Sequence, residues 1–213
     1  MMSTHCRCAS LAALLLILPH AAWAAPEYFA ASPASGKYSR ALALNDAGRY
    51  AVNSAGPDIP YQAASINGGP MSESVGSLGG SVTQIRALNN LGEAVGVSTT
   101  ASGEYHSFLY SDGRMQDLTA RYGVQDARDI NDRGEIAART LDFRAAVLRD
   151  GVVDDFGPQN SAPGDMNGRG ELLVEYFADG LGYRTAVYRD GTMTELPRAG
   201  GTQKFGQAIN DAG

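Results

Sequence analysis

The chain has 213 residues, of which 23 are acidic and 17 basic, so its formal net charge is −6 at pH 7. An acidic chain lacks the basic face that binds the phosphates of nucleic acids, and we therefore expect no nucleic-acid partner. With 44% hydrophobic residues, a chain of this length can bury a core without disulfides or metals.

The first 24 residues have the pattern of an export signal. Arg7 is their only charge, residues 11–18 form an apolar run, and Ala22-Trp23-Ala24 is a small-x-small cleavage site. The apolar run is far shorter than the roughly 20 residues that span a bilayer. We predict cleavage near Ala24, a secreted or periplasmic location and no stable membrane insertion. The remainder, residues 25–213, is predicted to be a single β-repeat domain with a net charge of −7, because Arg7 is the only charge removed.

A turn motif recurs five times along residues 25–213. Each copy has an apolar residue, an asparagine, two variable residues and a glycine. Its asparagines are Asn45, Asn89, Asn131, Asn167 and Asn210, and the glycines that follow the first four are Gly48, Gly92, Gly134 and Gly170. Asparagine tolerates left-handed backbone and glycine accepts positive φ, so each copy predicts a hairpin turn between short apolar runs. The asparagines are 44, 42, 36 and 43 residues apart, which indicates an internal repeat.

A second turn falls about halfway through each repeat. An Asp-Gly pair between apolar runs predicts a type I′ turn, because that turn needs positive φ at both central residues. The pairs are Asp112-Gly113, Asp150-Gly151 and Asp190-Gly191, with a degenerate Gly68-Gly69 in the first repeat. Each is followed by an apolar residue expected to be buried, at Met71, Met115, Val153 or Met193. Two residues further on comes an acid on the same face, at Glu73, Asp117, Asp155 or Glu195.

Each repeat therefore predicts four short antiparallel strands, which is the size of one propeller blade. In the second repeat these strands are residues 85–88, 93–98, 107–110 and 115–118. We predict an all-β, β-propeller-like chain forming an incomplete ring. Its units are approximately 39–75, 82–118, 125–156 and 162–196, with the start of a fifth at 205–213 and a candidate ring-closing strand at 27–31. Because the fifth unit lacks two strands, we expect the chain to be a fragment of a longer product.

The second repeat carries a family resemblance. Residues 88–96 (Leu-Asn-Asn-Leu-Gly-Glu-Ala-Val-Gly) and 106–118, which begin His-Ser-Phe-Leu, resemble the HAF family of bacterial extracellular repeats. The third and fourth repeats depart from that family, since Arg144 and Arg184 stand where it has histidine. The resemblance implies an exported, propeller-like repeat protein with no established activity. It brings no catalytic residues to this sequence.

The candidate chemical sites favour structural roles. His106 is the only histidine after the signal; without cysteine partners it cannot build a zinc site, and no Gly-x-Ser-x-Gly elbow accompanies it. Residues 165–170 begin like a calcium loop, yet Arg169 occupies the third ligand position and Tyr176 the twelfth. The matching stretch at 129–134 has Arg133 in the same place. We predict no catalytic residue, no metal and no cofactor.

We expect ligand binding at the irregular connections between the second and third strands, rather than at these sites. Variable loops on a rigid scaffold often carry function. Their aromatic residues are Tyr61, Tyr105, Phe143, Phe177 and Tyr183. These side chains could stack on a sugar or hold a peptide, or they could cap the edge of the core.

The predicted function is an exported, non-enzymatic binding or scaffold module for an unidentified extracellular ligand, either a glycan or a protein. The alternative is a secreted, glycosidase-like hydrolase with carboxylates from separate blades. Four acids at one repeat position do not favour it, since a glycosidase needs two particular carboxylates at a defined separation. An enzyme should show polar residues from different blades that converge in the central channel and break the repeat. A binding module should show an aromatic rim without such a cluster.

Overall fold

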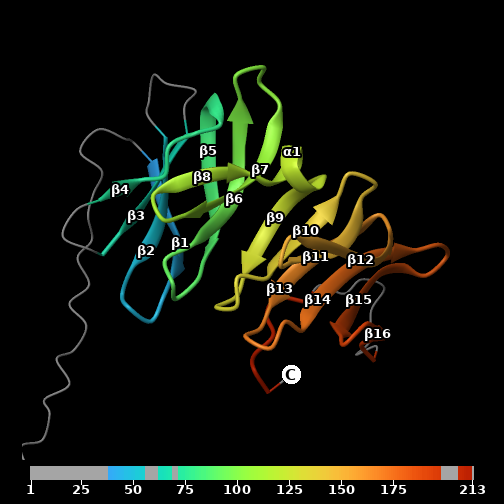
Figure 1. Ribbon diagram of the computed structural model, residues 1–213. Helices are drawn as coiled ribbons and strands as arrows, with labels where there is room; N and C mark the ends of the chain where they lie inside the picture. The colour runs from blue at the N-terminus through green and yellow to red at the C-terminus, as the bar shows by residue number, and fades with distance from the viewer. Residues whose placement is uncertain (1–37, 56–61, 69–71, 198–205, 213) are drawn as a thin grey trace, which may run out of the picture.

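The computed structural model describes residues 38–55, 62–68, 72–197 and 206–212. The predicted signal segment, the candidate strand at 27–31, Met71 and Tyr61 lie outside these ranges. The described residues form sixteen strands and one short helix. Four consecutive antiparallel sheets fan out in an arc in chain order (Figure 1), which confirms the all-β, propeller-like prediction.

Each blade holds four strands, and each strand pairs antiparallel with the next. The first blade contains β1 (Tyr38–Leu44), β2 (Tyr50–Ala55), β3 (Gln62–Asn67) and β4 (Glu73–Ser74). The second contains β5 (Gly79–Leu88), β6 (Ala94–Thr100), β7 (Tyr105–Ser111) and β8 (Arg114–Asp117). The third contains β9 (Val124–Ile130), β10 (Ile136–Thr140), β11 (Arg144–Arg149) and β12 (Val152–Gln159). The fourth contains β13 (Ser161–Met166), β14 (Leu172–Ala178), β15 (Gly182–Arg189) and β16 (Thr192–Glu195).

The helix α1 (Leu118–Tyr122) is not predicted by any apolar periodicity in the sequence. It replaces the expected end of the fourth strand of the second blade. Asp117 caps it, since its carboxylate accepts a hydrogen bond from Ala120 N at 2.8 Å, and Gly123 ends it with φ of 68°. In the part of the chain that the structure describes, no helix has the length and apolar character needed to cross a membrane.

The first strands of the blades, β1, β5, β9 and β13, contact one another in chain order. Residues 206–212 continue this series, because Ile209 N donates to Asp165 at 2.8 Å and Asn167 Nδ2 donates to Asn210 O at 2.9 Å. Within the described residues, β1 and β13 do not pack together as neighbouring first strands do, so the ring they form is incomplete.

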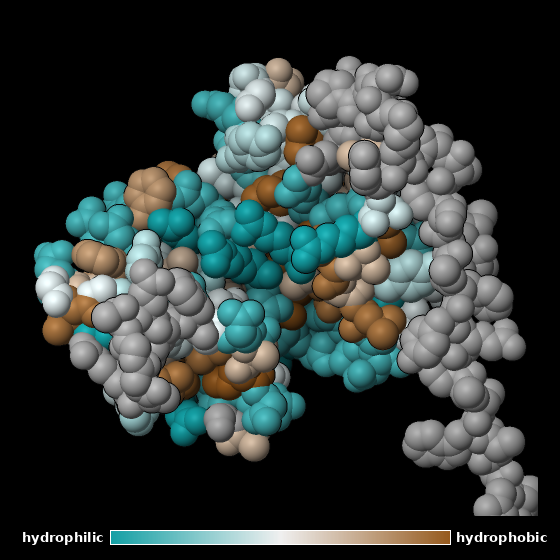
Figure 2. All heavy atoms as spheres, turned by 180° about the vertical axis from the view of Figure 1, so that it is seen from behind, coloured by the Kyte–Doolittle hydropathy of each residue, from teal (hydrophilic) through white to brown (hydrophobic). Residues whose placement is uncertain are grey.

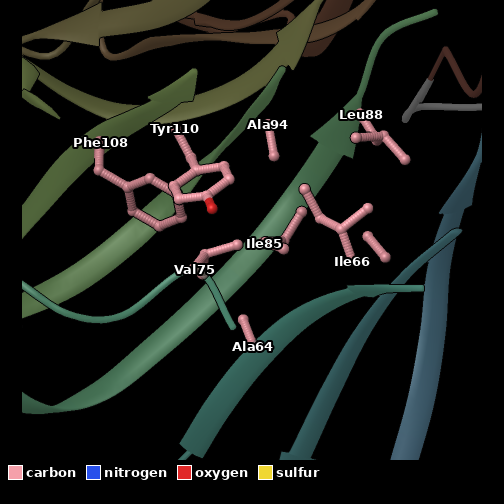
Figure 3. Packing of buried hydrophobic residues seen from close by; sticks show 9 residues of the cluster. Ala64, Ile66, Val75, Ile85, Leu88, Ala94, Phe108 and Tyr110 are labelled. Carbon is pink, nitrogen blue, oxygen red and sulfur yellow. The ribbon is translucent and has the colours of Figure 1, made fainter. Parts of the chain in front are cut away.

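The core lies between blades rather than within them. Ile66 and Val75 of the first blade pack against Ile85, Phe108 and Tyr110 of the second (Figure 3). A second cluster joins blades two and three, and a third joins blades three and four. A single sheet of small residues has no partner for its apolar face, so each blade depends on its neighbours for burial.

The repeated turn asparagines are buried, between 4% and 7% exposed for the first four. At Asn131, the side-chain Oδ1 accepts hydrogen bonds from Arg133 N at 3.0 Å and Glu135 N at 3.1 Å. Its Nδ2 donates to Glu135 Oε2 at 2.6 Å and to the backbone carbonyl of Asn167 at 3.4 Å. Every polar position of the amide is therefore occupied, and one of the bonds reaches the next blade.

The same inter-blade bond recurs around the arc. Each asparagine Nδ2 donates to the carbonyl of the next turn asparagine, from Asn45 to Asn89 at 3.0 Å, from Asn89 to Asn131 at 3.1 Å and from Asn167 to Asn210 at 2.9 Å. We call this series the asparagine ladder. It joins the four blades and residues 206–212. The bonds lie at the end of each blade where the first strand turns into the second.

The turn glycines meet a backbone requirement. Gly92 has φ of 85° and Gly170 has φ of 78°. A Cβ added at these two positions would also lie 2.4 Å from the end of an arginine side chain, Arg49 Nη1 or Arg133 Nη2. Glycine is needed for the left-handed backbone. At the second turns, Asp112 and Gly113 have φ of 52° and 73°, as a type I′ turn requires.

Asn131→Asp tests the ladder. The substitution keeps the shape but removes both Nδ2 donors and places a carboxylate against Glu135 and the Asn167 carbonyl. We expect a loss of about 3 kcal/mol or more in the free energy of unfolding, measured by urea denaturation. Asn160→Asp is the matched control, because Asn160 is exposed and its φ of 61° suits aspartate. Equal stability of the two variants would contradict the structural role of the ladder.

Candidate functional site

The first strands line an open cavity of about 450 Å³ at the centre of the arc. Its wall combines apolar residues from β1 and β5 with charged residues from β5, β9 and β13. The charged residues are Arg86, Arg128, Asp129 and Asp165, and the apolar wall includes Leu42 and Leu44. Polar residues from different blades thus converge in the central channel.

Each first strand departs from regular pairing at the same point. The pairing shifts between Ala41 and Ala43 in β1 and between Ile85 and Ala87 in β5, and corresponding shifts occur in β9 and β13. A bulge of this kind leaves an extra residue and re-aims its side chain. The bulges carry Leu42, Arg86, Arg128 and Gly164, all of which line the cavity.

Asp126 collects three arginines beside this cavity. It pairs with Arg86 of the second blade, with Arg128 Nη2 at 3.0 Å and, more distantly, with Arg139 Nη1 at 4.0 Å. Arg128 also donates to the carbonyl of Pro163 in the fourth blade at 3.2 Å. Three cations around one carboxylate leave this side of the channel positively charged.

Asp129 and Asp165 break the repeat, since the same position holds Ala43, Ala87 and Ala208 in the other units. Asp129 accepts hydrogen bonds from Ile130 N at 2.8 Å and Met166 N at 2.7 Å, and Asp165 accepts one from Ile209 N. Each carboxylate therefore reaches the first strand of the following unit.

The two carboxyl groups also contact each other. Burial raises the pKa of Asp129 to about 7, against the opposing effect of the two backbone N–H groups, and the neighbouring Asp165 adds to the rise. The pair consequently shares a proton below about neutral pH. Sequence reasoning considered Asp129 and Asp165 only as the start of calcium loops. Their departure from alanine at one repeat position is the signal that could have found them.

The acids that follow the second turns have histidine or arginine partners across the blade. His106 Nδ1 lies 2.7 Å from Asp117 Oδ2. In the next two blades, Arg144 Nε lies 3.2 Å from Asp155 and Arg184 Nε lies 3.3 Å from Glu195. The residue at the family's histidine position is thus paired with the acid in each case. Glu73, in the first blade, instead pairs with Arg49 at 2.8 Å and accepts a hydrogen bond from the Tyr110 hydroxyl.

The loop aromatics lie at the opposite end of the blades from the asparagine ladder, since they flank the connections between second and third strands. Of those described, Tyr105 is 63% exposed, Phe143 48%, Phe177 49% and Tyr183 44%. Phe177 and Tyr183 are cross-strand neighbours whose rings meet edge to face at 5.4 Å. The structure brings these two together but does not gather all four into one surface.

Phe143 has an unusual backbone for an exposed aromatic residue. Its φ is 61°, in the left-handed region that glycine and asparagine favour. The conformation is fixed by hydrogen bonds from Phe143 N to Thr140 O at 3.0 Å and from Ser161 N to Phe143 O at 3.1 Å. The Arg139 guanidinium stacks on its ring at 4.8 Å.

Asp129→Asn tests the shared proton. A folded-state pKa above the unfolded value means that the folded chain keeps a proton that the unfolded chain loses between about pH 4 and pH 7. Stability due to this group should therefore fall as pH rises through that window, by up to about 1.4 kcal/mol per pH unit. The variant's amide can donate permanently to Asp165, so it should lose this dependence and be more stable than the parent at pH 8.

Urea denaturation at pH 5, 6.5 and 8 provides the measurement, with the exposed-turn variant Asp112→Asn as control. Burial also raises the pKa of Glu175, which contributes with the same sign. The difference in unfolding free energy between Asp129→Asn and the parent at each pH separates the contribution of Asp129 from that of Glu175. Parallel pH profiles for the two proteins would show that the carboxyl pair does not share a proton.

The sequence matches no protein-family model, and no curated protein matches it. The resemblance to the HAF repeats therefore stays a prediction.

Proposed function

We propose that this protein is an exported, non-enzymatic binding module that holds an extracellular protein ligand on its loop face. The loop face is the end of the blades that carries the connections between second and third strands, and its described aromatic residues are Tyr105, Phe143, Phe177 and Tyr183. The observation that carries the proposal is Phe143, an exposed aromatic side chain in a left-handed backbone conformation.

Phe143 remains 48% exposed in this conformation. A non-glycine residue held in the left-handed region costs about 1–3 kcal/mol, and such strain concentrates at functional sites. Leu141, two residues earlier on the same loop, is also 55% exposed. Arg139 stacks on the ring and presents a cation beside it. Aromatic residues and arginine are the side chains most enriched in the energetic centres of protein interfaces.

The fourth blade carries a second apolar group on the same face, where Leu181 lies between the paired rings of Phe177 and Tyr183 in sequence. Leucine side chains give a sugar no ring on which to stack, so these loops favour a protein ligand over a glycan. Seen from behind, hydrophobic residues form small separate groups in a largely hydrophilic surface (Figure 2).

The alternative function, a secreted hydrolase, is favoured by one observation. Asp129 and Asp165 come from different blades, converge in the channel and break the repeat. Glycosidase carboxyls, however, stand about 5–5.5 Å or 6.5–9.5 Å apart to leave room for the sugar or a water molecule. The carboxyls of Asp129 and Asp165 touch, and both accept backbone N–H groups. This arrangement supports the binding proposal over glycoside hydrolysis.

Phe143→Asn separates function from stability. Asparagine adopts the left-handed region more readily, so the variant should be more stable by about 1 kcal/mol in urea denaturation. If Phe143 is retained for function at the expense of stability, replacing it should give this gain in unfolding free energy. A loss of stability instead would show that Phe143 is a packing residue, which would remove the main support for the proposal.

Binding is tested by immobilising the full chain and its variants, identifying a ligand in the extracellular proteins of the source culture, and titrating that purified ligand. Phe143→Asn and the double variant Phe177→Ala/Tyr183→Ala should each weaken binding at least about tenfold. Leu91→Ala is the control, because Leu91 is even more exposed, at 67%, but lies on the asparagine-turn side. Ligand binding that is insensitive to the loop variants would contradict the proposal, and binding to a glycan array would favour a sugar ligand.

A further inference from the structure

The channel carries both signs of charge. Arg86 and Arg128 project from the bulges of β5 and β9, and the carboxyl groups of Asp129 and Asp165 belong to β9 and β13. Leu42 and Leu44 of β1 complete the lining with apolar surface. The hollow is open to solvent, and its volume of about 450 Å³ lies within the size range of small-molecule sites.

Arg86 retains donor capacity toward this space. Its side chain is 35% exposed, and the described part of the chain gives it one hydrogen-bonded partner, Asp126, through Nη1. A guanidinium has five N–H groups in a planar fork that suits a carboxylate. Asp126 is also shared with Arg128 and Arg139, so it does not neutralise the three cations.

The carboxyl pair is not required for blades to pack. Between the first and second blades the same repeat position holds Ala43 and Ala87, and the first strands still contact each other there. Burying two neighbouring carboxyls is unfavourable, so their presence at the wall of a cavity points to a ligand. An ammonium group has three donors and can bond both carboxylates once it displaces their shared proton.

We propose that this channel binds a small aliphatic zwitterion, a free amino acid or dipeptide, with its carboxylate on Arg86, its ammonium on Asp129 and Asp165, and its side chain against Leu42 and Leu44. A ligand with only a cation would leave Arg86 unmatched, and one with only an anion would face the carboxyl pair. A dipolar ligand can pair its carboxylate with Arg86 and its ammonium with Asp129 and Asp165. This site is separate from the loop face and does not depend on the proposed protein ligand.

Isothermal titration of the full chain with L-leucine and with L-alanyl-L-leucine tests the assignment. At least one of them should bind, and the matched analogues N-acetyl-L-leucine and L-leucinamide, which lack the ammonium and the carboxylate respectively, should bind at least about tenfold more weakly. Absence of binding by both free ligands up to about 10 mM, or equal binding of the N-acetyl analogue, would overturn the proposal.

Variants locate the site. Asp165→Asn keeps an oxygen for Ile209 N but loses the charge, and it should weaken binding at least about tenfold, as should Arg86→Gln. Leu42→Trp fills the channel without altering any charged residue, so it should abolish binding even if the charge variants fold poorly. Asp112→Asn is the control and should bind like the parent, because Asp112 lies in an exposed turn and does not line the channel. Unchanged binding by Leu42→Trp would show that the ligand lies elsewhere.

Discussion

A buried asparagine amide has two donors and two acceptor positions to satisfy, and the repeated turns meet that requirement in a way that joins one blade to the next. Two acceptor contacts and one donor contact close the turn itself, as at Asn131, while the remaining donor reaches the backbone of the following blade. Aspartate has the same shape but no donors, which is why the motif depends on asparagine. The turn and the inter-blade joint are therefore a single structure, and a blade cannot form its hairpin fully without a neighbour. This coupling suits sheets whose apolar faces are buried only between blades.

Acids four residues after three of the ladder asparagines, at Glu93, Glu135 and Glu171, extend the same principle. Burial opposes ionisation of Glu135, but hydrogen bonds from Asn131, Arg133 and Arg149 outweigh it and lower the pKa of that carboxyl. The charge is thus stabilised by groups that the turn and the third strand already hold in place. Asp129 is the opposite case, because burial raises its pKa and the neighbouring Asp165 carboxyl adds to the rise. The first arrangement supports the fold, whereas the second is unfavourable to it and calls for a functional explanation.

The turns, the four-stranded units and the propeller arrangement could be predicted because they rest on local chemistry repeated at a regular spacing. Asn131 and Gly134, or Asp112 and Gly113, specify their backbone within a few residues. The helix α1 could not be predicted, since five residues carry no periodicity and its cap depends on Asp117. Pairings such as His106 with Asp117 follow from strand register, and the meeting of Asp129 with Asp165 follows from the packing of two blades. Neither relation is visible in the spacing of residues along the chain.

The asparagine ladder joins turns that are separated by 44, 42, 36 and 43 residues, yet the bond it makes is the same at each step. Everything between two ladder positions can lengthen or shorten at its loops without altering the joint. The ladder consequently works as a fixed hub to which units of unequal size are attached. Insertion of a whole unit would need only an asparagine turn that accepts a hydrogen bond from one neighbour and donates one to the other. Such a chain can therefore gain or lose blades by duplication while its centre keeps the same geometry.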